Sequence, residues 1–140
     1  MYNIAIDGPA GAGKSTIARM AAEKLGFIYV DTGAMYRAMA LYFIRNGISS
    51  SDEEAIEAAC KDINISIEYQ DGEQVVLLGS ENVNAFIRTE EVSMMTSDIS
   101  KYAAVREKLL DVQRNLARTK DVIMDGRDIG TTVFPDAQLK

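Results

Sequence analysis

Short apolar runs and longer amphipathic runs alternate along the first 62 residues of the chain. Tyr2–Ile6 and Phe27–Val30 are short, apolar and bounded by glycine or polar residues, which predicts two buried strands. Lys14–Leu25 and Gly33–Arg45 predict helices that follow these strands. In the first helix the apolar residues expected on one face are Ile17, Met20, Ala21 and Leu25. This order with short connections favours a parallel sheet with right-handed crossovers.

Local signals mark where the helices begin and end. Gly26 is expected to end the first helix and Asn46 with Gly47 the second, because glycine adopts the left-handed conformation that closes a helix. Ser51 and Glu54 have the Ser-x-x-Glu spacing of a capping box. The sequence therefore predicts a short helix from Ser51 to about Lys61.

The pattern changes after residue 62, where apolar and polar residues begin to alternate. Alternation predicts a half-buried strand through Ile63, Ile65, Ile67 and Tyr69. Asp71 and Gly72 are a strong signal for a two-residue hairpin turn. Val75–Leu78 is expected to return as the partner strand, and Glu81–Ile87 is a candidate third strand. We interpret this stretch as an antiparallel β insert in an α/β chain.

A long amphipathic run precedes the last predicted strand. Ser100–Arg118 predicts a helix, and Val122–Met124 predicts a third core strand that ends in the polar segment 125–128. The helix carries an apolar stripe, interpreted as core packing, at Tyr102, Val105, Leu109, Val112 and Leu116.

Composition narrows the possible functions. The chain has 140 residues, 47% of them hydrophobic, which suits one domain with a sizeable core. Its formal net charge of −6 disfavours broad binding to nucleic acid or to an anionic membrane. It has no histidine, which excludes a Ser-His-Asp triad, and its one cysteine, Cys60, is interpreted as a buried apolar residue. The N-terminal run lacks the features of a signal peptide or membrane span, so we expect a cytoplasmic protein.

The segment from Gly8 to Ser15 carries the strongest chemical signal. It reads GPAGAGKS, which fits the phosphate-loop pattern G-x-x-x-x-G-K-[ST] between an apolar strand and a helix. Small residues let backbone N–H groups surround a phosphate, and the helix N-terminus favours negative charge. In this pattern Lys14 reaches the β- and γ-phosphates and Ser15 offers its hydroxyl to Mg²⁺. The motif predicts binding of a nucleoside triphosphate and leaves open what its energy is used for.

Two further segments could hold a second anionic substrate. Thr32 and Arg37 follow the second strand. The alternative is that Thr32 is an ordinary helix cap and Arg37 an ordinary surface arginine. The segment from Asp125 to Thr131 follows the third strand and contains Arg127. Ligands of open α/β sheets bind beyond the carboxyl ends of the strands, where Asp7, Asp31 and Asp125 are expected.

Several motifs together make the chain resemble the bacterial cytidylate kinase family. They cover the whole chain in the order GPAGAGKST, DTGAMYR, IRTEEV, VREKLL and DGRDIGTTVFPDA. The resemblance implies an α/β fold in which a P-loop kinase core, a parallel sheet flanked by helices, carries a small antiparallel insert that embraces the monophosphate. It divides the chain into 1–62 (first part of the core), 63–94 (insert) and 95–140 (second part of the core).

The resemblance also implies roles for individual residues. The expected catalytic residues are Lys14, Arg127 and Asp128. The expected ATP phosphate-binding residues are Gly8, Ala10, Gly11, Ala12, Gly13, Lys14, Ser15 and Thr16. The expected CMP-binding residues are Thr32, Arg37, Ser97, Arg106, Asp125, Arg127 and Asp128. Arg37, Arg106 and Arg127 would contact the CMP phosphate, and Ser97, Asp125 and Thr32 the base or sugar. Arg88 matches the family motif but has no clear role. Without the resemblance, Ser97 would be interpreted as a helix cap and Arg106 as an arginine on the solvated face of a helix.

The implied reaction is the transfer of a phosphoryl group from ATP, with Mg²⁺, to CMP or dCMP. Alternatives that stay open are a P-loop kinase for UMP, AMP or a non-nucleotide acceptor, a nucleotide-binding switch, and a nucleotide-binding fragment without turnover. Full-length relatives are expected to be monomers and to continue with another core strand and a lid that carries arginines. We therefore expect these 140 residues alone to have little activity, and either to associate through the edge of the first strand or to represent part of a longer protein.

Overall fold

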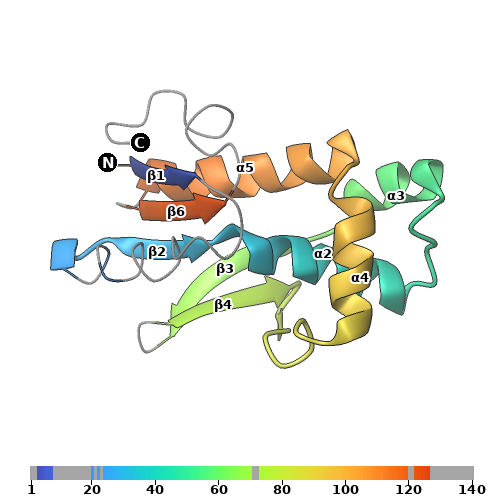
Figure 1. Ribbon diagram of the computed structural model, residues 1–140, viewed down its shortest axis with the longest axis horizontal. Coiled ribbons are helices and arrows are strands. Elements are labelled where there is room, and N and C mark those ends of the chain that lie inside the picture. Colours follow the sequence, from blue (N-terminus) through green and yellow to red (C-terminus); the bar gives the residue numbers. More distant parts are fainter. Residues whose placement is uncertain are drawn as a thin grey trace. The chain divides into compact units, whose positions relative to one another are not determined.

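The computed structural model describes residues 3–7, 20, 22, 24–70, 73–119 and 122–126, and it contains helices and two small sheets (Figure 1). The chain divides into two compact units, one from 1–32 with 113–140 and the other from 33–112. The strands are β1 (Asn3–Asp7), β2 (Ile28–Asp31), β3 (Ile65–Gln70), β4 (Glu73–Leu78), β5 (Glu81–Asn82) and β6 (Val122–Gly126). The helices are α2 (Thr32–Arg45), α3 (Glu53–Cys60), α4 (Glu90–Ile99) and α5 (Ala103–Thr119).

In the first unit, β6 pairs in parallel with β1 on one side and with β2 on the other, in the order β1-β6-β2. The predicted strands are confirmed, with bounds that differ by one or two residues from the expected ones. Asn3 and Ile28 both lie opposite Val122, so the three strands begin in register. Val30 and Val122 are buried, in keeping with strands that contribute to a core.

The predicted helix before β2 lies partly outside the described residues, but its end is confirmed. Gly26 has φ +69°, and the Phe27 N–H donates to the Ala22 carbonyl at 3.0 Å, an i to i−5 bond that closes a helix. The prediction that Met20 and Leu25 share a buried face is wrong, because their exposed fractions are 54% and 56%. Five residues advance about 140° around an α-helix, so these two side chains do not share a face.

Helix α2 is the most deeply buried element of the second unit. Its completely buried side chains are Met35, Ala38, Met39, Ala40 and Phe43. The helix ends as predicted, because Gly47 adopts φ +66° and two backbone bonds close the last turn: Gly47 N–H to Ile44 and Ile48 N–H to Phe43. This packing on most sides holds the α2 backbone firmly, and with it the side chains that project from its first turns.

Helix α3 forms as predicted, but the expected capping box is wrong. The N-cap is Asp52, whose side chain accepts the Ala55 N–H at 3.2 Å. Ser51 lies one residue earlier, where its hydroxyl and that of Ser49 are 2.9 Å apart. The carboxylate is the better acceptor for a helix N-terminus because it carries a full charge. Cys60, at the end of α3, is buried as expected, and burial raises the pKa of its thiol.

The predicted antiparallel hairpin is confirmed in β3 and β4. Its register runs from Ile65 opposite Leu78 to Gln70 opposite Glu73, which leaves two residues between the paired ends. Those two residues, Asp71 and Gly72, lie outside the described residues.

The predicted third strand is wrong in length, because pairing of β5 with β4 stops at Asn82 rather than continuing to Ile87. The side chain of Asn84 takes over from the strand. Its Oδ1 accepts the Val76 N–H at 3.0 Å and its Nδ2 donates to the Gln74 carbonyl at 2.9 Å. A side-chain amide that satisfies two backbone groups of β4 lets the chain turn away without leaving them unpaired.

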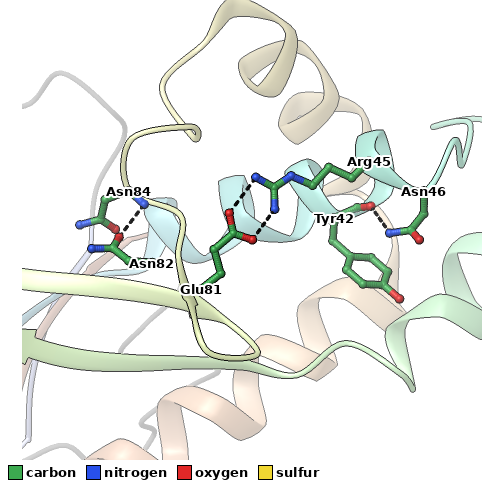
Figure 2. A network of polar contacts seen from close by, with 6 residues as sticks. All are labelled: Tyr42, Arg45, Asn46, Glu81, Asn82 and Asn84. Atoms are coloured by element: carbon green, nitrogen blue, oxygen red, sulfur yellow. Dashed lines mark hydrogen bonds and ion pairs between the residues drawn. The ribbon is translucent and has the colours of Figure 1, made fainter.

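An ion pair joins β5 to the end of α2 (Figure 2). Arg45 donates to both carboxylate oxygens of Glu81, at 2.7 and 3.1 Å. The hydrogen bond from Arg45 lowers the pKa of the Glu81 carboxyl. Arg45 also lies over the ring of Phe86, 5.3 Å from its centroid. These contacts hold the short strand β5 although both of its residues are exposed.

Helix α4 is an element that the sequence analysis missed. Its N-cap, Thr89, accepts the Val92 N–H at 3.2 Å, and two acidic residues occupy its first turn. Its buried residues Val92, Met95 and Ile99 have helical spacing. This combination of cap and spacing is a signal that could have revealed the helix.

Helix α5 begins at Ala103, three residues later than predicted. Before it, Tyr102 donates through its backbone N–H to Ile99 at 3.1 Å and through its hydroxyl to the Ser50 carbonyl at 2.6 Å. Of the predicted stripe, Val105 and Leu109 are completely buried, whereas Tyr102 is only half-buried. The last two predicted positions, Val112 and Leu116, are only half-buried. Gln113, the neighbour of Val112, is instead 3% exposed, and its Oε1 has no hydrogen-bond partner in the structure as described.

Among the described residues no helix is long and apolar enough to cross a membrane. The predicted division at residues 62 and 94 stays a prediction, and the second of these boundaries falls inside α4.

Candidate functional site

The carboxyl ends of three parallel strands meet at one edge of the first unit's sheet. Asp125 of β6 lies opposite Ile6 of β1 and opposite Asp31 of β2. Asp7 is the next residue of β1 and lies opposite Gly126. The three aspartates are therefore neighbours in the strand register, as expected for the edge where open α/β sheets bind ligands.

Thr32 follows directly on β2 and is the first residue of α2. It is 5% exposed, one of only two buried polar or charged residues in the described part of the chain. A buried hydroxyl at a helix start is suited to a hydrogen bond rather than to solvation.

Arg37, one turn further along α2, is held by two hydrogen bonds from a single nitrogen. Its Nη1 donates to the Ile87 carbonyl at 3.1 Å and to the Ser93 Oγ at 2.7 Å. Arginine has five N–H donors, two of them on Nη1, so these bonds use that nitrogen completely. Within the described residues, the Nε and Nη2 hydrogens engage no other group. The guanidinium thus has one fixed nitrogen and one unoccupied edge of the kind that binds a phosphate or carboxylate in bidentate fashion.

The partners of Arg37 lie 50 and 56 residues away along the chain. Sequence reasoning missed Ser93, and nothing in its local pattern marks it, because a serine in the first turn of a helix is common. The bond to Ser93 exists only because α4 packs close to α2 within the second unit.

Arg106 is the second predicted phosphate-binding arginine in the same unit. It is exposed on the first turn of α5, and its charge acts on the hydroxyl of Tyr36, the residue before Arg37. Burial raises the pKa of Tyr36 and the nearby positive charge of Arg106 partly offsets that rise. Arg106 therefore lies close enough to Tyr36 for its charge to act on that hydroxyl.

The guanidinium of Arg106 forms no ion pair or hydrogen bond with any residue that the structure describes. A cation with no acidic partner retains its capacity for an external anion.

The remaining predicted residues of this unit lie at exposed positions. Ser97 is exposed in the interior of α4, so its interpretation as a cap before a helix is wrong; the cap of α4 is Thr89. Its neighbour Asp98 accepts a hydrogen bond from the Ser50 hydroxyl at 3.2 Å. Arg88 is exposed in the turn before α4. Among the described residues, no hydrogen bond links the Ser97 side chain to Arg37 or to Arg106.

The predicted phosphate loop lies outside the described residues. That holds for all of its predicted ATP-binding residues: Gly8, Ala10, Gly11, Ala12, Gly13, Lys14, Ser15 and Thr16. It also holds for Arg127 and Asp128, which follow β6. Among the described residues no group of three or more acidic or cysteine side chains could hold a metal ion. The predicted Mg²⁺ contact is through Ser15, so it stays a prediction.

Comparison with known proteins identifies the family. The model of the cytidylate kinase family matches residues 4–140. The chain belongs to the cytidylate kinase family.

Individual members of the cytidylate kinase family are similar along almost the whole chain. The cytidylate kinase of Caldicellulosiruptor saccharolyticus is 55% identical over 138 residues, which cover 99% of this chain and 61% of that protein. The cytidylate kinase of Lactobacillus johnsonii is 48% identical over 140 residues, 100% of this chain and 61% of that protein. The cytidylate kinase of Syntrophotalea carbinolica is 45% identical over 137 residues, which cover 98% of this chain and 58% of that protein. The chain thus spans about three fifths of the length of these relatives.

Proposed function

We propose that the whole protein transfers the γ-phosphoryl group of ATP to CMP or dCMP, and that these 140 residues, which span about three fifths of the length of their relatives, have little activity alone. Membership of the cytidylate kinase family supports this reaction, and the resemblance of the motifs supports the same acceptor. The two sheets fit the architecture expected of such a kinase: a P-loop core around β1, β6 and β2, with the β3–β4–β5 sheet as the insert for the monophosphate. In this proposal the core consists of 1–62 and 95–140, and the insert of 63–94.

The roles of the site residues follow the same proposal. Backbone N–H groups of the loop from Gly8 to Thr16 would hold the ATP phosphates, with Lys14 as the local cation. Ser15 would hold Mg²⁺ together with the nucleotide, and the ion would supply charge neutralisation at the transferring group. Thr32, Ser97 and Asp125 would contact the base or sugar of CMP. Association through the edge of β1 also stays a prediction.

The observation that supports a monophosphate as the acceptor is the hydrogen bonding of the Arg37 guanidinium. Its Nη1 is occupied by the Ile87 carbonyl and Ser93, and within the described residues its Nε and Nη2 remain available. A guanidinium held from one side presents two parallel N–H donors to an incoming anion at little further entropic cost. Arg106, which influences the neighbouring Tyr36, adds a second positive charge. A monophosphate carries the charge and geometry that this pair accepts.

The chemistry requires orientation more than proton transfer. An oxygen of the CMP phosphate forms a bond to the γ-phosphorus while the bond from that phosphorus to the bridging oxygen breaks, and ADP leaves. The attacking oxygen is already anionic, so no strong base is needed. The chain's contribution is to hold the two phosphates in line and to neutralise their charge through Lys14, Arg37, Arg106 and Arg127.

A thermal-shift comparison tests the proposal. CMP and dCMP should stabilise the protein more than UMP or AMP, because a mismatched base leaves polar groups in the pocket unpaired. At 100 times the dissociation constant, binding stabilises the folded state by about 2.7 kcal/mol, which raises the melting temperature by several degrees. Equal shifts with all four monophosphates would refute the proposed acceptor, and a shift with UMP or AMP alone would replace it.

Variants of two arginines on α2 test whether Arg37 binds the acceptor phosphate. Arg37→Ala should reduce the shift with CMP and leave the shift with ATP–Mg²⁺ unchanged, which also shows that the variant is folded. Arg45→Ala is the matched control: it removes an arginine from the same helix, one whose partner is Glu81. If both variants respond to CMP as the wild type does, Arg37 is not in the acceptor site.

A further inference from the structure

We propose that Ser93 is a positioning residue for the acceptor phosphate, acting through Arg37. The inference rests on the proposed function, since it takes the monophosphate as the anion that Arg37 binds. Ser93 sets the orientation of the guanidinium by accepting one of the two Nη1 hydrogens at 2.7 Å. It thereby determines which edge of Arg37 faces the ligand.

The two acceptors of Arg37 are themselves held by the fold. Ile87 is 1% exposed, so its backbone carbonyl belongs to a packed segment. Ser93 lies in the first turn of α4, where its own N–H donates to Thr89 at 3.0 Å. The helix is fixed there by the Thr89 cap and by buried Val92. Both acceptors are thus rigid, and a donor nitrogen bonded to two rigid acceptors leaves the guanidinium plane little freedom to rotate.

The two bonds differ in what their loss would do. The Ile87 carbonyl alone fixes one N–H direction and lets the guanidinium turn about that bond. Without the Ser93 hydroxyl, Nη1 keeps an unsatisfied hydrogen in a part-buried place, and the side chain can recover a bond by turning its Nη2 inward. Such a turn would withdraw the very edge that the phosphate requires.

The serine hydroxyl also matches the required chemistry. An arginine can only donate hydrogen bonds, so its partner must be an acceptor, and a hydroxyl is a neutral one. A carboxylate at residue 93 would hold Arg37 more strongly, but it would cancel the positive charge that a phosphate needs. Serine orients the arginine and leaves its charge available.

The positioning itself is tested without ligand, by NMR of the arginine Nε–Hε groups in ¹⁵N-labelled protein. The signal of Arg37 is assigned by its loss in Arg37→Lys. In Ser93→Ala its heteronuclear NOE should fall and its hydrogen exchange should quicken. Ser93→Thr, which keeps the hydroxyl, should restore both, and Ser100→Ala, at the C-cap of the same helix, is a matched control. An unchanged Arg37 signal in Ser93→Ala would overturn the positioning role.

The consequence for the ligand is tested by titrating CMP and cytidine. Ser93→Ala should weaken CMP binding about tenfold, which corresponds to about 1.4 kcal/mol, and leave cytidine binding unchanged. Ser93→Thr should bind CMP within about twofold of the wild type. Equal loss for CMP and cytidine would overturn the inference, because it would mean general damage to the fold. If the wild-type protein binds CMP no better than cytidine, the proposed function fails, whereas the NMR result still decides whether Ser93 orients Arg37.

Discussion

Replacement of Asn84 by alanine tests whether a single side chain substitutes for a strand. Asn84 follows β5 and bridges two backbone groups of β4 that β5 no longer reaches. Its Oδ1 accepts the Val76 N–H at 3.0 Å, and its Nδ2 donates to the Gln74 carbonyl at 2.9 Å. Asn84→Ala removes both bonds and leaves the backbone in place.

The expected loss differs between the two backbone groups. Val76 is 1% exposed, so its N–H has no ready access to water, and a buried donor without an acceptor costs about 1–3 kcal/mol. Gln74 is only half-buried, so water can replace Asn84 at its carbonyl and the loss there is a few tenths of a kcal/mol. We therefore expect Asn84→Ala to lower the free energy of unfolding by about 2 kcal/mol.

Urea denaturation and amide hydrogen exchange measure this effect. With an m-value of about 1–2 kcal/mol per M, the midpoint should fall by about 1–2 M, and the Val76 amide should exchange faster. Asn46→Ala is the matched control: it removes one exposed bond, from Nδ2 to the Tyr42 carbonyl at 2.8 Å, and should cost about 0.5 kcal/mol or less (Figure 2). The reasoning is refuted if both variants shift the midpoint equally and Val76 exchange does not change.

Further variants test the ion pair and the two halves of the proposed site. Because Arg45 lowers the pKa of Glu81, the pair stabilises the fold above the ordinary Glu pKa of 4.5 and this contribution is lost as pH falls below it. Glu81→Gln should therefore lower the urea midpoint slightly at pH 7 and not at pH 3; an equal difference at both pH values would contradict the electrostatic cause. Lys14→Ala should lose most ATP–Mg²⁺ affinity and about 10²-fold or more in turnover while CMP still shifts the melting temperature. Arg127→Ala should weaken every monophosphate, whereas Ser97→Ala should mainly change the preference among bases; binding measurements that gave the reverse pattern would exchange these two roles.

Local patterns predicted most of the elements of the fold because their causes lie within a few residues. Glycine at positions 26 and 47 ends a helix wherever it can adopt a positive φ, and alternation near Ile65 and Ile67 produces a half-buried strand. The expected aspartates at the strand ends, such as Asp31, are neighbours in the observed register for a similar reason. Once the strands are parallel, their carboxyl ends must meet at one edge.

The sequence predicted the helix boundaries less well where two neighbouring residues could each begin a helix. Ser51 and Asp52 are both good caps, and only the structure decided that the carboxylate of Asp52 closes α3. The helix expected from Ser100 to Arg118 forms as α5, from Ala103 to Thr119, but the separate helix α4 that ends at Ile99 just before it was missed. A cap contributes only about 1 kcal/mol, so packing can move a helix boundary by a residue or two between competing caps.

The sequence by itself determined the family, the sheet with its aspartate-bearing edge, and the list of candidate site residues. Tertiary structure alone decided how those residues are held. Arg37 is oriented by groups 50 and 56 residues away, and Asn84 satisfies backbone atoms of another strand. Gln113 is buried although the predicted apolar stripe passes through its neighbour Val112. Such contacts depend on which surfaces meet after folding, and neither composition nor periodicity contains that information.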